Sequence, residues 1–221
     1  MLLIIKIIRT TSILIGIFIV IVGYFFIFHS YNDDQYTSYV DNSTQMENQF
    51  SLTSDTNKNG ITNEVEITSN ARDLVGTLYD PLKGSFYDIG GKMGFIVCID
   101  VPRIVFGQAG ISLAQLLRDD FEESPEHYET DEGSNTPDTP FFYRRVRNVY
   151  DYAKGNDLLI RQADTPQIGD IVFYGRYHAT LVTYVHEDGT YDEVEAHPKL
   201  IFVKEHKKKE WQPRDVARLF K

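Results

Sequence analysis

Cys98, the only cysteine in the 221-residue chain, stands where the sequence predicts the start of a helix. Pro102 follows closely, and a helix tolerates proline only within its first turn, whose N–H groups have no intrahelical partner. A thiol at a helix N-terminus faces the positive end of the helix dipole, which favours the nucleophilic thiolate. Cys98 is therefore a candidate nucleophile. The alternative is a small, buried apolar residue.

A catalytic thiolate needs a histidine that takes its proton and a third polar group that orients the imidazole. His178 directly precedes the apolar segment ATLVTYV, so a predicted strand would hold it on rigid backbone. Glu195 and His197 lie on a predicted neighbouring strand and, two residues apart, point to the same face. We favour Glu195, because it lies deeper in the strand and a carboxylate stabilises imidazolium. His197, which precedes Pro198, is the alternative.

Three charged residues are candidates for substrate binding. Asp100, two residues after Cys98, would either complement the helix dipole or bind an amino group of the substrate. Arg144 and Arg145 would either bind a substrate carboxylate or pair with the many acidic residues of the chain.

Helices are predicted before strands, which indicates an α+β domain with an antiparallel sheet. Capping residues and apolar periodicity predict four helices, over 71–78 (capped by Ser69 or Asn70), from Cys98 to about 106, from Ser112 to about 121, and over 145–153. Short apolar or alternating segments predict four strands, at 171–175, 179–185, 191–197 and 200–206.

The N-terminal part has a different composition. No charged residue occurs from Thr10 to Phe28, a run long enough to cross a bilayer, with Lys6 and Arg9 before it and acidic residues after it. The positive-inside rule predicts a single-pass anchor with a cytoplasmic N-terminus and an extracellular C-terminal domain. A cleaved signal peptide and a buried helix are the alternatives. We therefore divide the chain into a cytoplasmic tip and transmembrane helix (1–29), a flexible polar stalk (30–68) and a folded domain (69–221).

Composition excludes several classes of protein and site. The net charge of −10 and the absence of a basic domain argue against nucleic-acid binding. A single cysteine excludes an intramolecular disulfide. No cofactor and no metal are expected.

The segment TPQIGDIVFYGRYHATLVTYVHEDGTYDEVEAHP resembles the NlpC-type cell-wall cysteine peptidases. That family carries a P-x-x-G-D-[LIV]-V-F-[FY] strand, then a histidine at the start of the next strand, then a polar third residue. Pro166, Gly169 and Asp170 match the lead-in, His178 matches the base, and Val194-Glu195-Ala196 matches the third position, which supports Glu195 over His197.

A closer resemblance is to an uncharacterised exported branch of this superfamily, known only as a domain of unknown function. Its motifs occur here in the same order across residues 71–203, as ARDLVGTLYDP at 71–81, CIDV at 98–101, GISL at 110–113 and RRVRN at 144–148, followed by the GDIV strand and His178.

The resemblance implies a papain-like fold and a membrane-anchored hydrolase that cleaves amide bonds in the stem peptides of peptidoglycan. It also implies a tyrosine that helps to hold the oxyanion, for which Tyr79 and Tyr87 are the candidates. Two other functions fit the same scaffold. One is an inactive wall-binding or complex-forming module, and the other is a cysteine acyltransferase or thioesterase.

Overall fold

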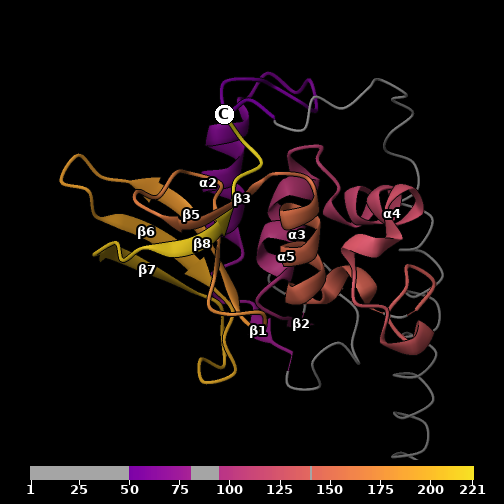
Figure 1. Ribbon diagram of the computed structural model, residues 1–221. Coiled ribbons are helices and arrows are strands. Elements are labelled where there is room, and N and C mark those ends of the chain that lie inside the picture. Colours follow the sequence, from indigo (N-terminus) through magenta and orange to yellow (C-terminus); the bar gives the residue numbers. More distant parts are fainter. Residues whose placement is uncertain (1–49, 81–94, 140) are drawn as a thin grey trace, which may run out of the picture. The chain divides into compact units, whose positions relative to one another are not determined.

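The computed structural model describes residues 50–80, 95–139 and 141–221, and the statements below concern those ranges. Four α-helices precede a six-stranded antiparallel sheet, which confirms the α+β class (Figure 1). The helices are α2 (Asn63–Asp73), α3 (Asp100–Gln108), α4 (Leu113–Glu123) and α5 (Val146–Gly155). Three short 3₁₀ turns lie between α4 and α5, at Pro125–His127, Asp131–Gly133 and Phe142–Arg144.

The sheet has the strand order β3-β8-β4-β5-β6-β7, so the last strand of the chain pairs between β3 and β4. Its strands are β3 (Leu159–Ala163), β4 (Ile171–Phe173), β5 (Ala179–Val185), β6 (Tyr191–Glu195), β7 (Lys204–Lys209) and β8 (Arg214–Ala217). A separate parallel pair is formed by β1 (Leu78–Tyr79) and β2 (Phe95–Ile96).

Helix α3 lies between the sheet and α4 (Figure 1). Its first seven residues, Asp100–Phe106, are all buried, and the Phe106 ring meets Phe220 edge-on at 5.3 Å between centroids. Pro102 lies in the first turn of α3, as predicted. The Ser112 hydroxyl accepts a hydrogen bond from Gln115 N, which confirms the predicted cap of α4.

The helix predicted over 71–78 is misplaced. Helix α2 begins after Thr62, whose backbone is extended, and it ends at Asp73. Ser69, predicted as a cap, lies inside the helix, where its hydroxyl donates to the carbonyl of Val65. Gly76, with φ of +94°, turns the chain out of the helix towards strand β1. Ser69 and Asn70 could each have capped a helix, but the folded protein starts the helix earlier and places both residues within it.

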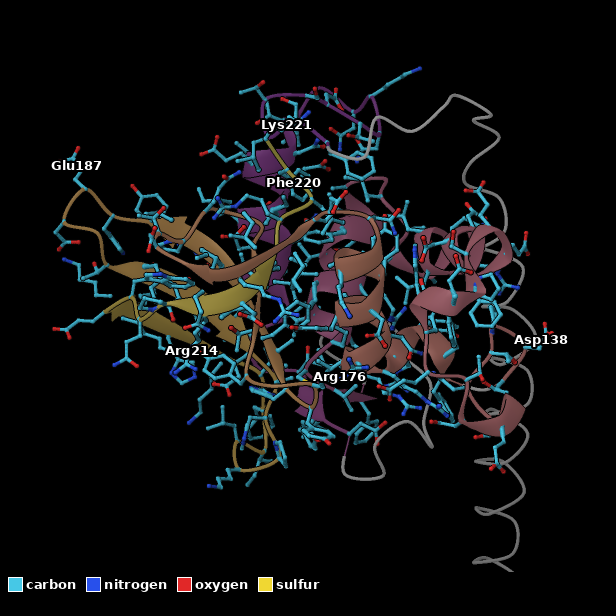
Figure 2. The ribbon with its side chains drawn as sticks, viewed as in Figure 1. Asp138, Arg176, Glu187, Arg214, Phe220 and Lys221 are labelled. Carbon is cyan, nitrogen blue, oxygen red and sulfur yellow. The ribbon has the colours of Figure 1, made fainter. Side chains whose placement is uncertain are left out.

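The folded region extends N-terminally at least to Phe50, further than the predicted boundary at residue 69. Phe50 N donates to Leu219 O at 2.7 Å, and Lys221 N donates to Phe50 O at 2.8 Å. Figure 2 shows Phe220 and Lys221 beside α2, at the end of the molecule opposite Arg176. The polar composition of 30–68 hid this contact, because backbone pairing with the C-terminal segment does not depend on side-chain polarity.

Strands β3 and β8 were not predicted, because Arg161, Gln162 and Arg214 interrupt their apolar pattern. The predicted transmembrane segment and Tyr87 lie outside the described residues. Among the helices in the described ranges, none has the length and apolar character needed to cross a membrane.

Candidate active site

Cys98 lies in the turn that joins β2 to α3, two residues before the first helical residue. The turn is closed by backbone hydrogen bonds from Asp100 N to Val97 O (3.0 Å) and from Val101 N to Cys98 O (3.3 Å). The cysteine is a partly buried free thiol that packs against the core. Its position confirms the prediction that a helix begins beside Cys98.

Asp100 is fully buried and holds this turn together. One carboxylate oxygen accepts from Val97 N at 2.9 Å, and the other accepts from Arg103 Nε at 2.9 Å. Arg144 binds both oxygens through its Nε atom and also approaches Asp80. Burial raises the pKa of Asp100, but Arg103 and Arg144 lower it more strongly, so this carboxyl is held ionised.

Two of the three residues predicted to bind substrate, Asp100 and Arg144, are therefore buried in the interior of the protein. The contacts of Asp100 and Arg144 match their alternative roles, namely a negative charge at a helix start and an arginine paired with acids. The Arg145 guanidinium donates to the Asn135 side chain at 2.7 Å.

His178 is presented by the loop that joins β4 to β5. Tyr174 N donates to His178 O at 2.9 Å, which closes the loop. Arg176, within the loop, binds Asp151 at 2.7 Å, which holds the loop against α5.

The Gly169-Asp170 pair that precedes β4 has a packing role. Asp170 forms two hydrogen bonds to Arg218, and Gly169 has φ of +84°, with no room for a Cβ beside the Phe220 ring.

Cys98, His178 and Glu195 come together around one imidazole. His178 Nε2 lies 2.8 Å from Glu195 Oε1, and the imidazole also interacts with the Cys98 thiol. Because Nε2 faces Glu195, Nδ1 is the nitrogen left for the thiol. Burial lowers the pKa of His178, but its hydrogen bonds and charge interactions with Cys98 and Glu195 raise it to about 9. These interactions therefore favour an imidazolium ion beside the Glu195 carboxylate.

His197 is in the site but is not the hydrogen-bond partner of His178. Its ring stacks edge-on against His178 at 4.9 Å between centroids, and its Nδ1 accepts from Lys199 N. Of the two candidates for the third position, Glu195 is the one that contacts the imidazole. Burial raises the pKa of Glu195, but His178 and the other neighbouring histidines lower it overall.

His206 also approaches the site, although nothing in the sequence singled it out. His206 Nε2 lies 2.8 Å from Glu195 Oε2, an ion-pair distance without hydrogen-bond geometry. In the observed register Glu195 is opposite Lys204, so His206, two residues further along β7, lies on the same face as Glu195. Period-2 alternation would have revealed this placement once the register was known.

Tyr79 lies at the end of β1, opposite Ile96 of β2 and close to Cys98. Burial raises the pKa of the Tyr79 hydroxyl, and the negative charges of Cys98, Asp80 and Asp100 raise it further. The hydroxyl therefore keeps its proton and can donate a hydrogen bond beside the thiol. Tyr87, the other candidate, lies outside the described residues.

The side chains of His178, Glu195 and His197 bring three ligand atoms within 4.8 Å of one another, close enough for a metal ion. A metal there would compete with the hydrogen bond between His178 and Glu195.

A hollow of about 320 Å³ lies beside the β4–β5 loop. Its lining includes Tyr150, Phe173, Arg176 and Arg214 but does not include Cys98 or His178.

Comparisons with known proteins assign a family to the chain. No curated protein and no solved structure matches it. The family model described as "Domain of unknown function (DUF1287)" matches residues 83–212, more than half of the chain, and this range contains Cys98, His178 and Glu195. The chain therefore belongs to the DUF1287 family.

Proposed function

We propose that this protein is a cysteine hydrolase of the papain-like NlpC type that cleaves amide bonds in peptidoglycan stem peptides. One observation carries the proposal. The imidazole of His178 is hydrogen-bonded to Glu195 and interacts with Cys98, the only thiol of the chain. A nucleophile, a base and a group that orients the base are the minimum set for this chemistry.

The reaction begins with attack of the Cys98 thiolate on the amide carbonyl, which forms a C–S bond and a tetrahedral oxyanion. The backbone N–H of Cys98 and the Tyr79 hydroxyl are the donors that would hold this oxyanion. His178 gives its proton to the leaving amine as the C–N bond breaks, and an acyl-enzyme remains. A water molecule, deprotonated by His178, then attacks the acyl carbon and releases the acid and the thiolate.

Glu195 keeps the imidazole in one orientation through both steps, because its carboxylate accepts from Nε2 and leaves Nδ1 for the proton transfers. The choice of peptidoglycan as substrate rests on the resemblance of residues 166–196 to the NlpC-type peptidases. The hydrophobic run from Thr10 to Phe28 supports an extracellular domain on a single-pass anchor.

The test is release of peptide fragments from isolated peptidoglycan by the full chain purified in detergent. Mass analysis should find new free amines and carboxylates, with no such products from Cys98→Ser or His178→Asn. His186→Asn is the matched control, because His186 also lies 2.8 Å from a carboxylate, that of Asp192, on the same sheet. That variant should keep full activity.

Intact wall in every condition would refute the peptidase assignment. Wall binding that survives in Cys98→Ser, without any cleavage, would support the inactive module. A stable acyl adduct on Cys98 that is transferred to an amine or alcohol, rather than to water, would support the acyltransferase.

A further inference from the structure

A second site lies outside the family match, in the loop that leads into α2. Residues 55–66 read DTNKNGITNEVE. This is the twelve-residue spacing D-x-[DN]-x-[DN]-G-x₅-E of calcium-binding loops, with oxygen ligands at positions 1, 3, 5 and 12 and glycine at position 6. Those positions are occupied by Asp55, Asn57, Asn59 and Glu66, with Gly60 at the turn.

The conformation of the loop agrees with that spacing. Gly60 has φ of +90°, which allows the sharp turn at position 6. The Asp55 carboxylate accepts from Asn59 N at 3.0 Å and from Gly60 N at 2.7 Å, so the loop is wrapped around its first side chain. Asn59 Oδ1 in turn accepts from Ile61 N at 2.9 Å.

Glu66 is the observation that points to a ligand. The residue is only 5% exposed. Its Oε1 accepts from the side-chain amides of Asn57 (2.9 Å) and Asn59 (2.7 Å), so the carboxylate points into the loop. Its Oε2 is buried and has no hydrogen-bond partner among the described residues. A buried carboxylate oxygen without a partner is costly, and a cation would remove that cost.

We propose that residues 55–66 bind one Ca²⁺ ion. Oxygens of Asp55, Asn57 and Asn59, the carbonyl of Ile61 and both oxygens of Glu66 would be the ligands. Each asparagine can turn its amide to present Oδ1 in place of Nδ2 with almost no change in shape. All of these ligands are hard oxygens, the type that Ca²⁺ prefers. With only two carboxylates, we expect a dissociation constant of roughly 10⁻⁴–10⁻³ M, the range of extracellular modules.

The calcium loop also contacts the helix that begins beside Cys98. Asn57 Nδ2 donates to the carbonyl of Gln108, the last residue of α3, at 2.9 Å. A Cβ at Gly110 would lie only 3.0 Å from Asn57 Cβ, so the loop and the end of α3 are tightly packed. Figure 1 shows β2 at one end of α3 and residues 50–62 at the other. The packing at Gly110 does not depend on the orientation of the Asn57 amide, so the bound ion would restrain a loop that stays packed against the end of α3.

The test uses the full chain in detergent, first treated with a calcium chelator and then titrated with CaCl₂. Calorimetry should find one ion per chain, and 10 mM Ca²⁺ should raise the thermal midpoint by roughly 3–10 °C. The same concentration of MgCl₂ should have a much smaller effect, because Mg²⁺ demands a smaller, octahedral site. The Cys98→Ser variant should bind Ca²⁺ equally, so this result is independent of the hydrolase proposal.

Two variants remove the ligand charges with little change in shape, Glu66→Gln and Asp55→Asn. Each should weaken Ca²⁺ binding at least tenfold, and a failure of one to fold leaves the other. Glu64→Gln is the matched control, because it removes the same charge from the same helix at a position that supplies no ligand. The proposal is wrong if the wild type shows no saturable binding up to 10 mM Ca²⁺, or if Glu66→Gln and Asp55→Asn respond like Glu64→Gln.

Discussion

Replacement of Glu195 by glutamine tests the central contact of the candidate active site. The pKa of His178 is raised from 6.5 to about 9, which corresponds to about 3 kcal/mol of net interaction with the charged ring. Cys98 and Glu195 share this interaction. Glutamine keeps an acceptor oxygen but loses the charge, and a charged hydrogen bond is worth about 1–2 kcal/mol more than a neutral one. We therefore expect Glu195→Gln to lower the pKa of His178 by about one unit.

The assay is the rate of Cys98 alkylation by iodoacetamide from pH 4 to 10, followed by intact mass of the full chain. The imidazolium beside the thiolate loses its proton about one unit earlier in the variant, so Glu195→Gln should move the upper inflection of the profile from about pH 9 to about pH 8. Asp192→Asn is the control, since it removes the carboxylate from the pair with His186, which has no thiol. An upper inflection at the same pH in Glu195→Gln and wild type would refute the assigned role of Glu195.

The same contact has a consequence for stability. A histidine whose pKa is raised on folding contributes stability that is complete below its unfolded value of 6.5 and is lost as the pH rises through about 9. The thermal midpoint of the full chain should therefore exceed that of Glu195→Gln most clearly near pH 6, and the difference should shrink above pH 9. A difference that is constant from pH 6 to pH 10 would contradict this account.

Three further substitutions test the surroundings of the site. Asp100→Asn removes the negative charge that Arg103 and Arg144 share and should cost about 3–5 kcal/mol, seen as a thermal midpoint lower by roughly 6–20 °C; a loss below 2 °C would show that the pairing is unimportant. Tyr79→Phe should lower kcat by roughly 10–1000-fold with an unchanged thermal midpoint, and an unchanged kcat would exclude its hydroxyl from the oxyanion site. Gly169→Ala places a Cβ 2.9 Å from a core ring at positive φ and should reduce the free energy of unfolding in urea by about 1–3 kcal/mol, whereas wild-type stability would show that the backbone adapts.

The parts of the site that the sequence predicted have strong local signals. Pro102 limits where its helix can start, and that start determines the position of Cys98. His178 directly precedes β5 and Glu195 is the last residue of β6, so the pairing of these two strands brings them to the same edge. His206 has no local signal of this kind. Its approach to Glu195 depends on the register between β6 and β7, which shifts between Tyr191 and Glu193 and cannot be counted from the sequence.

The prediction of a stalk at residues 30–68 failed for a different reason. The sequence contained a local signal there, but the average composition of the segment concealed it. Scored by composition, residues 30–68 are polar and predict a stalk. Scored by position, residues 55–66 place oxygen-bearing side chains at regular intervals around Gly60. The interaction of Phe50 with the C-terminal segment, by contrast, is a contact between distant parts of the chain that no local pattern predicts.

Burial separates three charged residues of the motifs from Cys98 and His178. Asp100 of the CIDV motif, Arg144 of the RRVRN motif and Asp170 of the lead-in to β4 are buried, and each is neutralised by a partner at hydrogen-bond distance. Such pairs contribute little net stability compared with apolar packing, but the loss of one partner is costly, so they define one geometry for the turns that carry them. Cys98 lies on one of those turns and His178 lies on the loop at the other end of β4, and both are themselves only partly buried. In this arrangement the buried charges position the site, and chemistry is left to the few polar groups that a substrate can reach.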